Sequence, residues 1–233
     1  MPEKHLSTQF DAELAGLSNR VLEMGGLAET QVTAAVHALT GFSAEQAALV
    51  LNQEARVNRL ELEIDHDLQA TIARRQPTAR DLRLLIAVSK ATANLERVGD
   101  EAARIARTVQ KLINQGVSSR LPISDLEFCA TLATAQLRRA LDAFARLDAT
   151  TALEVLRHDD EVDREFEGLL RKLITYMMED PRTISTAIDL VFVAKAIERV
   201  GDHAKNLSEA VIYIVKGADV RHSTVEEVKN IVG

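Results

Sequence analysis

The sequence of 233 residues has no tryptophan, and only 3% of its residues are aromatic, with four prolines and ten glycines. β-Sandwiches and β-barrels need frequent turns and strands rich in aromatic and β-branched residues, so this composition argues against both. Hydrophobic residues make up 46% and charged residues 27% of the chain, which excludes a disordered segment. The composition is typical of long helices that bury a substantial core.

An excess of positive charge is also lacking, since 35 acidic residues outnumber 28 basic ones and the formal net charge is −7. This balance opposes binding to nucleic acid or to an anionic membrane surface, and it favours a cationic partner or metal ions. A single cysteine, Cys129, excludes an internal disulfide. The first ten residues resemble no secretory signal, and no apolar stretch approaches the roughly 18 residues of a membrane span. We therefore expect a cytoplasmic protein that associates with a membrane only through its partners.

Helix start signals recur along the chain, each a hydroxyl residue followed three positions later by an acid or an amide. They are Ser43 with Gln46, Thr78 with Asp81, Ser124 with Glu127, Thr151 with Glu154, and Thr224 with Glu227. Pro77 and Pro181 stand where one helix should end and another begin. The pattern predicts helices at residues 8–40, 44–74, 78–114, 123–147, 151–179, 183–216 and 224–231. The longest predicted loop, residues 114–122, divides the chain almost in half.

The two halves of the sequence repeat each other. The motif Glu-Arg-Val-Gly-Asp at residues 96–100 recurs at residues 198–202, each time in the third long helix of its half. A pattern in the second helix, at residues 54–58, recurs at residues 159–163. A shared ancestor explains both repeats, so we predict an all-α fold of two pseudo-symmetric three-helix bundles, six long helices in all, from an internal duplication. The predicted divisions are residues 1–115 for the first repeat, 122–220 for the second, and 221–233 for a C-terminal tail with a short helix.

Carboxylates gather on single faces of the predicted helices, because residues four apart lie on the same side of a helix. Oxygen ligands of this kind suit a hard, octahedral metal ion. The candidate ligands in the first half are Glu54, Asn58, Glu61 and Asp65 on the second helix and Glu96 and Asp100 on the third. Those in the second half are Asp159, Asp163, Glu198, Asp202 and Asn206. The next two positions in line with Asp159 and Asp163 hold Phe166 and Leu170, which cannot bind a metal ion.

A plainer interpretation competes with metal binding, because an isolated Glu-x-x-x-Asp on a helix is usually a solvated face. The motif glycines, Gly99 and Gly201, each cost about 1 kcal/mol relative to alanine, so they need a reason. Close approach of a neighbouring helix is one reason, and room for a ligand cluster is the other. The sequence offers few other candidate sites. We expect His66, His158 and His203 at the surface, and the sequence has no glycine-rich phosphate-binding loop, no Gly-x-Ser-x-Gly motif and no Cys/His spacing typical of zinc sites.

Several segments resemble the PhoU family, the accessory regulators of bacterial phosphate uptake. They are Met24-Gly25-Gly26, Arg75-Gln76-Pro77-Thr78, both copies of the five-residue motif, Tyr176-Met177-Met178-Glu179-Asp180 and Tyr213-Ile214-Val215-Lys216-Gly217. The resemblance covers residues 8–222 and implies the six-helix fold and a homodimer. It also implies a negative regulator that binds the phosphate ABC importer, at its ATPase subunit, and the sensor histidine kinase PhoR, damping the starvation response when phosphate is plentiful.

The resemblance further implies iron or another divalent or trivalent metal ion on Glu/Asp-x-x-x-Asp motifs. These motifs fall here on Glu96 with Asp100, Glu198 with Asp202, Glu61 with Asp65, and Asp159 with Asp163. The family often places asparagine four residues after the motif. Asn206 fits that pattern, whereas Arg104 departs from it and could neutralise the first cluster without metal, which favours the second site.

The leading hypothesis is a regulator without enzymatic activity. One alternative is a metal-binding helical bundle, either a metal store or a metal-dependent enzyme. Di-iron bundles need two copies of a Glu-x-x-His element, whereas this sequence has one, at Glu63 and His66. A purely structural helical scaffold, whose acids only maintain solubility, is the third hypothesis.

Overall fold

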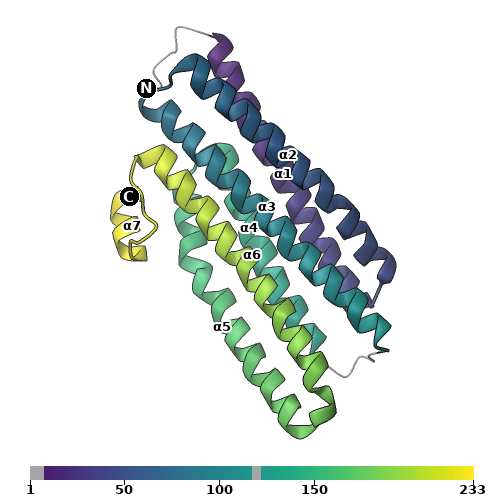
Figure 1. Cartoon of the computed structure of the whole chain (residues 1–233). Coiled ribbons are helices and arrows are strands. Elements are labelled where there is room, and N and C mark those ends of the chain that lie inside the picture. The colour runs from purple at the N-terminus through teal and green to yellow at the C-terminus, as the bar shows by residue number, and fades with distance from the viewer. Residues whose placement is uncertain (1–7, 117–121) are drawn as a thin grey trace.

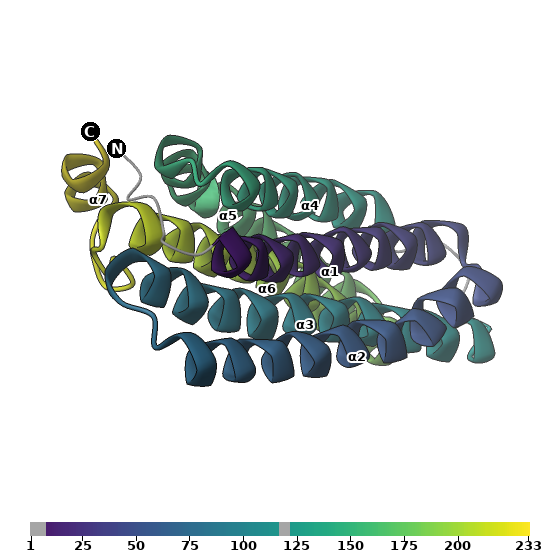
Figure 2. The ribbon, with the colours of Figure 1, turned by 90° about the horizontal axis from the view of Figure 1, so that it is seen from above.

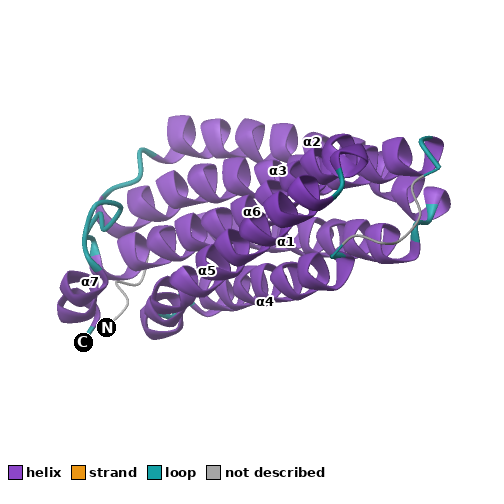
Figure 3. Cartoon of the chain, turned by 90° about the horizontal axis from the view of Figure 1, so that it is seen from below, coloured by secondary structure: helices purple, strands orange, loops and turns teal. Residues whose placement is uncertain are grey.

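The chain folds into long helices that run side by side (Figure 1). The structure, a computed structural model, describes residues 8–116 and 122–233, and these residues form no strand (Figure 3). The elements are α1 (Thr8–Gly41), α2 (Ala44–Arg75), α3 (Ala79–Asn114), α4 (Ile123–Arg146), α5 (Ala149–Glu179), a 3-10 turn (Pro181–Thr183), α6 (Ile184–Lys216) and α7 (Val225–Val232). The all-α class is confirmed, and each helix end lies within two residues of its predicted position. Most of the predicted loop at 114–122 falls outside the described residues.

Helix capping followed the predicted signals only in part. The side chains of Ser43 and Thr224 accept the predicted backbone hydrogen bonds, and Thr224 forms a complete capping box with Glu227. Thr78 occupies the cap position of α3 without a side-chain cap bond. Two predictions were wrong, at Ser124, which lies inside α4, and at Thr151, which lies inside α5.

The start of α5 shows why the second of these failed. The carboxylate of Asp148 accepts hydrogen bonds from the backbone N–H groups of Thr150 and Thr151 at 2.9 and 3.2 Å. The Thr151 hydroxyl donates to the same carboxylate at 2.7 Å. An aspartate three residues upstream therefore takes the cap position, and the helix begins two residues earlier than the threonine predicts.

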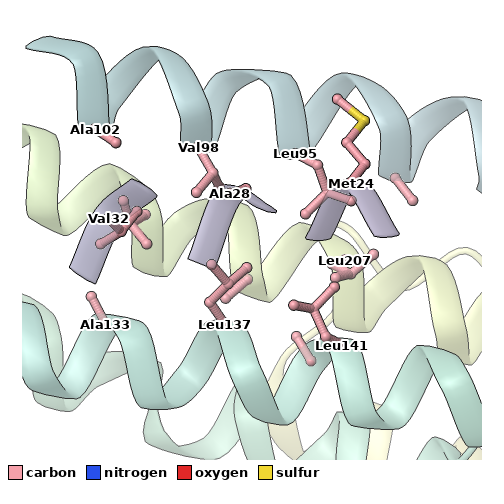
Figure 4. Packing of buried hydrophobic residues seen from close by; sticks show 14 of the residues in the cluster. Met24, Ala28, Val32, Leu95, Val98, Ala102, Ala133, Leu137, Leu141 and Leu207 are labelled. Carbon is pink, nitrogen blue, oxygen red and sulfur yellow. The ribbon is translucent and has the colours of Figure 1, made fainter. Parts of the chain in front are cut away.

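The two halves share one hydrophobic core. Helices α1, α2 and α3 pack against one another, as do α4, α5 and α6, and the halves meet where α3 contacts α6 and α1 contacts α4 (Figure 2). Figure 4 shows Ala28 and Val32 of α1 between Val98 of α3 and Leu137 and Ala133 of α4. A single buried cluster runs through all six long helices. The third helices of the two repeats are therefore held against each other at the centre of the molecule.

Two of the resembling segments owe their glycines to close helix packing. A Cβ atom on Gly25 would lie 2.3 Å from a methyl group of Leu141, so a larger residue would force the Leu141 side chain to move. A Cβ on Gly99 would lie 3.1 Å from Oε1 of the buried Gln31, and one on Gly201 would lie 3.2 Å from Oε1 of Gln136. At both motif glycines a valine of the second helix comes next. Close approach of neighbouring helices is thus the reason for the motif glycines.

Two further expectations from the sequence can be compared with the fold. Cys129 is only 3% exposed, in agreement with a core position on α4. None of the helices in the described ranges is long and apolar enough to cross a membrane.

Leu137→Ala should test the shared core directly. The Leu137 side chain is fully buried between the halves, so truncation should lower the free energy of unfolding by about 2–5 kcal/mol, as large-to-small core changes do. Leu62→Ala, at a side chain that is 70% exposed, is the matched control and should change stability by less than about 0.5 kcal/mol. Urea unfolding followed by circular dichroism measures both. Equal stability of the two variants would contradict a core shared at this position.

Candidate functional site

Four of the predicted carboxylates come together between α2 and α3. This α2–α3 cluster consists of Glu61, Asp65, Glu96 and Asp100. Burial raises the pKa of Glu61, and the neighbouring charges of Asp65 and Asp100 raise it further. The pKa of Glu96 is raised by burial and then by Asp100 and Glu61. The four groups therefore repel one another, and a bound cation would relieve that repulsion.

Two arginines lie near the α2–α3 cluster, one at its exposed edge and the other turned away from its carboxylates. Nε of Arg97 is 3.6 Å from a Glu96 oxygen, but the Arg97 side chain is 67% exposed. Arg104 turns away from the cluster and lies 3.3 Å from Oε2 of the buried Glu101. Arg199 of the other half donates to the other oxygen of Glu101 at 3.1 Å. The hypothesis that Arg104 neutralises the first cluster therefore fails.

The remaining two candidates on α2 are Glu54 and Asn58. Both oxygens of Glu54 accept hydrogen bonds from Arg107 at 2.7 Å, so Glu54 belongs to a separate ion pair. Asn58 is exposed on α2. Of the predicted stripe, Glu61 and Asp65 thus lie in the cluster, whereas Glu54 pairs with Arg107.

The second half forms its own cluster from Asp159 and Asp163 of α5 and Glu198 and Asp202 of α6. In this α5–α6 cluster the pKa of Asp202 is raised to about 6, first by burial and then by the charges of Glu198, Asp159 and Asp163. The pKa of Asp163 is raised by burial and then by Asp159 and Glu198. The four predicted carboxylates of this half therefore do lie together.

Two lysines complete the α5–α6 cluster, and sequence reasoning missed them. Nζ of Lys195 donates to Glu198 Oε1 at 2.6 Å, and Nζ of Lys205 donates to Asp159 Oδ2 at 2.5 Å. Lys195 also lies over the ring of Phe166, 5.4 Å from its centroid. Both lysines are three residues from a motif aspartate or glutamate, a spacing that could have identified them as helix neighbours of the acids.

Asn206 does not join its cluster. Its amide donates to Oδ1 of Asn94 at 3.0 Å, and that oxygen lies 2.9 Å from Nδ1 of His203. His203 and Asn206 line a cleft of about 600 Å³ between α3 and α6, together with Arg97 and Arg199. The expectation that His203 is a surface residue was wrong, since burial and the two arginines lower its pKa to about 4.

The two clusters differ in how well they suit a metal ion. The α2–α3 cluster offers four carboxylates, a donor set that suits a hard cation. The α5–α6 cluster already contains two ammonium groups. Within residues 8–116 and 122–233, no group of three or more His, Cys, Asp or Glu side chains is arranged closely enough to hold a metal ion as it stands. Every metal assignment made from the sequence stays a prediction.

Comparison with known proteins shows similarity over nearly the whole chain. The PhoU domain matches residues 21–109 and 127–211. A phosphate-specific transport system accessory protein PhoU homolog from Burkholderia sp is 48% identical over 228 residues, covering 97% of each chain. The protein named PhoU from Escherichia coli strain K12 is 42% identical over 219 residues, covering 94% of this chain and 90% of its own.

Solved structures agree with these sequence matches. The crystal structure of PhoU from Pseudomonas aeruginosa has a TM-score of 0.84 and 43% identity, covering 90% of this chain and all of that one. The phosphate transport system regulatory protein PhoU from Streptococcus pneumoniae has a TM-score of 0.83 and 27% identity, with 91% and 99% coverage. The similarity extends over nearly the whole chain in each case.

Asp202→Asn should stabilise the protein in a pH-dependent way. Because the folded-state pKa of Asp202 is raised to about 6 from 3.8, ionisation of Asp202 favours unfolding, and this loss of stability develops as pH rises from about 4 to 6. Asp202 is exposed, so water screens the effect and we expect the variant to gain only about 1 kcal/mol above pH 6. The gain should vanish near pH 4.

Thermal unfolding at pH 4, 5, 6 and 7 measures this gain. Asp142→Asn, at an exposed position on α4, is the control and should show no such trend. A difference between Asp202→Asn and wild type that is the same at pH 4 and pH 7 would show that the pKa of Asp202 is not raised in the folded protein.

Proposed function

The chain belongs to the PhoU family, and on that premise we propose that it is a negative regulator of the phosphate-starvation response and of phosphate uptake. It acts in the cytoplasm, as a homodimer, by binding the ATPase subunit of the phosphate ABC importer and the histidine kinase PhoR. The observation that carries the proposal is near full-length similarity to proteins named accessory or regulatory proteins of phosphate transport systems. Those names describe no enzyme, so we propose that the chain works by binding alone.

A regulator of this kind acts by binding one state of its partner more tightly than another. The α5–α6 cluster presents charge for such contacts: Asp163 and Asp202 are exposed, whereas the Glu198 side chain is only 12% exposed. Exposed carboxylates favour a basic partner surface and speed its association. In this proposal Asp163 and Asp202 contact the partner, while Glu198 holds Lys195 in place.

Exposed apolar side chains on α6 support the same surface. Ile184, Ile188 and Phe192 are 41%, 43% and 57% exposed and follow one another at four-residue spacing on the helix that carries Asp202. Residues at this spacing lie on one side of a helix, and exposed apolar patches mark protein contacts. An amphipathic, basic segment of a partner would match both the stripe and the acids.

Iron or another metal ion, as the family resemblance implies, fits the α2–α3 cluster better than its counterpart. Glu61, Asp65, Glu96 and Asp100 would hold it. When bound, the ion would supply positive charge that neutralises these four carboxylates and joins α2 to α3.

The double variant Asp163→Asn and Asp202→Asn tests the proposed binding surface. Both substitutions remove repulsion within the cluster, so the protein should stay folded. We expect several-fold weaker capture of the ATPase subunit and of the PhoR cytoplasmic region, because charges at the rim of an interface control association. Expression of phosphate-starvation genes in phosphate-rich medium should rise accordingly.

The matched control is Glu127→Gln with Asp142→Asn, two exposed acids on α4. This control should bind both partners as wild type does. Wild-type binding by the cluster variant would rule out the acidic surface, whereas failure of the wild-type chain to capture either partner would overturn the proposed function itself.

A further inference from the structure

The two carboxylate clusters are not equivalent in the internal repeat. The motif acids Glu96 and Asp100 correspond to Glu198 and Asp202, displaced by 102 residues. The second helices are displaced by 105 residues, as residues 54–58 and 159–163 show. By that displacement, Phe166 and Leu170 stand where the first half has Glu61 and Asp65. The second half therefore has apolar residues at two of the four carboxylate positions of the α2–α3 cluster.

The second half also has two positive charges that the first half lacks at the equivalent positions. At the displacement of the third helices, Lys195 and Lys205 correspond to Ala93 and Ala103. Phe166, in the position of Glu61, contacts Lys195 through its ring face, an arrangement that attracts an ammonium group. Phe166 and Lys195 thus stand in the second half where the first half has Glu61 and Ala93.

Each lysine holds a carboxylate that is largely removed from water. The Glu198 side chain, paired with Lys195, is 12% exposed, and the Asp159 side chain, paired with Lys205, is 10% exposed. A buried carboxylate needs a cationic partner, and these ammonium groups supply it. A metal ion entering the cluster would have to displace both ammonium groups or remain close to them. A metal ion and an ammonium group are both positive, so they repel strongly when they are close together.

We infer that Lys195 and Lys205 are the built-in counter-cations of the α5–α6 cluster, and that this cluster takes up no metal ion. The family resemblance places a metal there, and the asparagine at position 206 made this the favoured site from the sequence. The structure does not fit that assignment, because the two ammonium groups occupy the cluster and Asn206 bonds to Asn94 instead.

Manganese titration of the full chain, first freed of metal with a chelator, tests the inference. The matched variants are Glu198→Gln with Asp202→Asn in the second half, and Glu96→Gln with Asp100→Asn in the first. Free Mn²⁺ is measured by electron paramagnetic resonance. The second-half variant should bind Mn²⁺ within about twofold of wild type, whereas metal sites weaken by about 10–100-fold when even supporting groups are lost. Loss of Mn²⁺ binding in the second-half variant would overturn the inference.

The first-half variant separates this inference from the proposal of a metal at the α2–α3 cluster. A tenfold or greater loss of Mn²⁺ binding in that variant alone supports both. A wild-type chain that binds no Mn²⁺ agrees with the inference for the α5–α6 cluster and overturns the metal proposed at the α2–α3 cluster.

Replacing the lysines with the residues of the first half gives the second test. Lys195→Ala with Lys205→Ala should lower the midpoint of thermal unfolding by several degrees, because Glu198 and Asp159 lose their partners. The variant should also gain Mn²⁺ binding that Glu198→Gln with Asp202→Asn removes. Lys229→Ala, which breaks the exposed pair with Glu226, is the control and should leave both readouts unchanged. A lysine variant with the wild-type midpoint and no gain of Mn²⁺ binding would show that the lysines do not act as counter-cations.

Discussion

The close packing of the second helix of each half against the third is the constraint from which the rest of the site follows. Gly99 and Gly201 permit it, since a side chain at either position would meet a buried glutamine and a valine of the second helix. The residue after each glycine is an aspartate, Asp100 or Asp202, so helices that approach closely also bring their carboxylates together. Repulsion among these groups is the electrostatic cost of this packing, and each half must compensate for it.

The halves compensate differently, although they share an ancestor. In the α2–α3 cluster, burial and mutual repulsion raise the pKa of Glu61 and Glu96, and Arg97 contributes only from the exposed edge. In the α5–α6 cluster, two lysines pair directly with the least exposed acids. The first arrangement has an arginine only at its edge, whereas the second has two lysines paired with its acids. Duplication therefore preserved the packing at the glycine while the charge around it diverged.

The sequence predicted most of the fold because helix periodicity, prolines and the repeated motif depend on neighbours in the chain. Caps were less certain, since Asp148 competes with Thr151 for the start of α5 and local patterns do not decide between them. Side-chain direction was the main failure. Arg104 and Asn206 share a helix face with the motif acids, yet Arg104 pairs with Glu101 on its own helix and Asn206 bonds to Asn94 of the other half. Glu101 lies three residues before Arg104 on α3, whereas Asn94 lies across the α3–α6 contact from Asn206, which no spacing within one helix can show.

Divergence between the halves bears on the regulation through two partners that we propose. A strictly symmetric duplication would present the same surface twice, and two different partners would compete for either copy. Here the second half places exposed Asp163 and Asp202 near two lysines and carries Ile184, Ile188 and Phe192 on the same helix, whereas the first half has alanines at both lysine positions. The shared core fixes α3 against α6, so these unlike surfaces belong to one rigid body. Specificity is a difference of affinities between competing partners, and two surfaces of different charge provide that difference within a single chain.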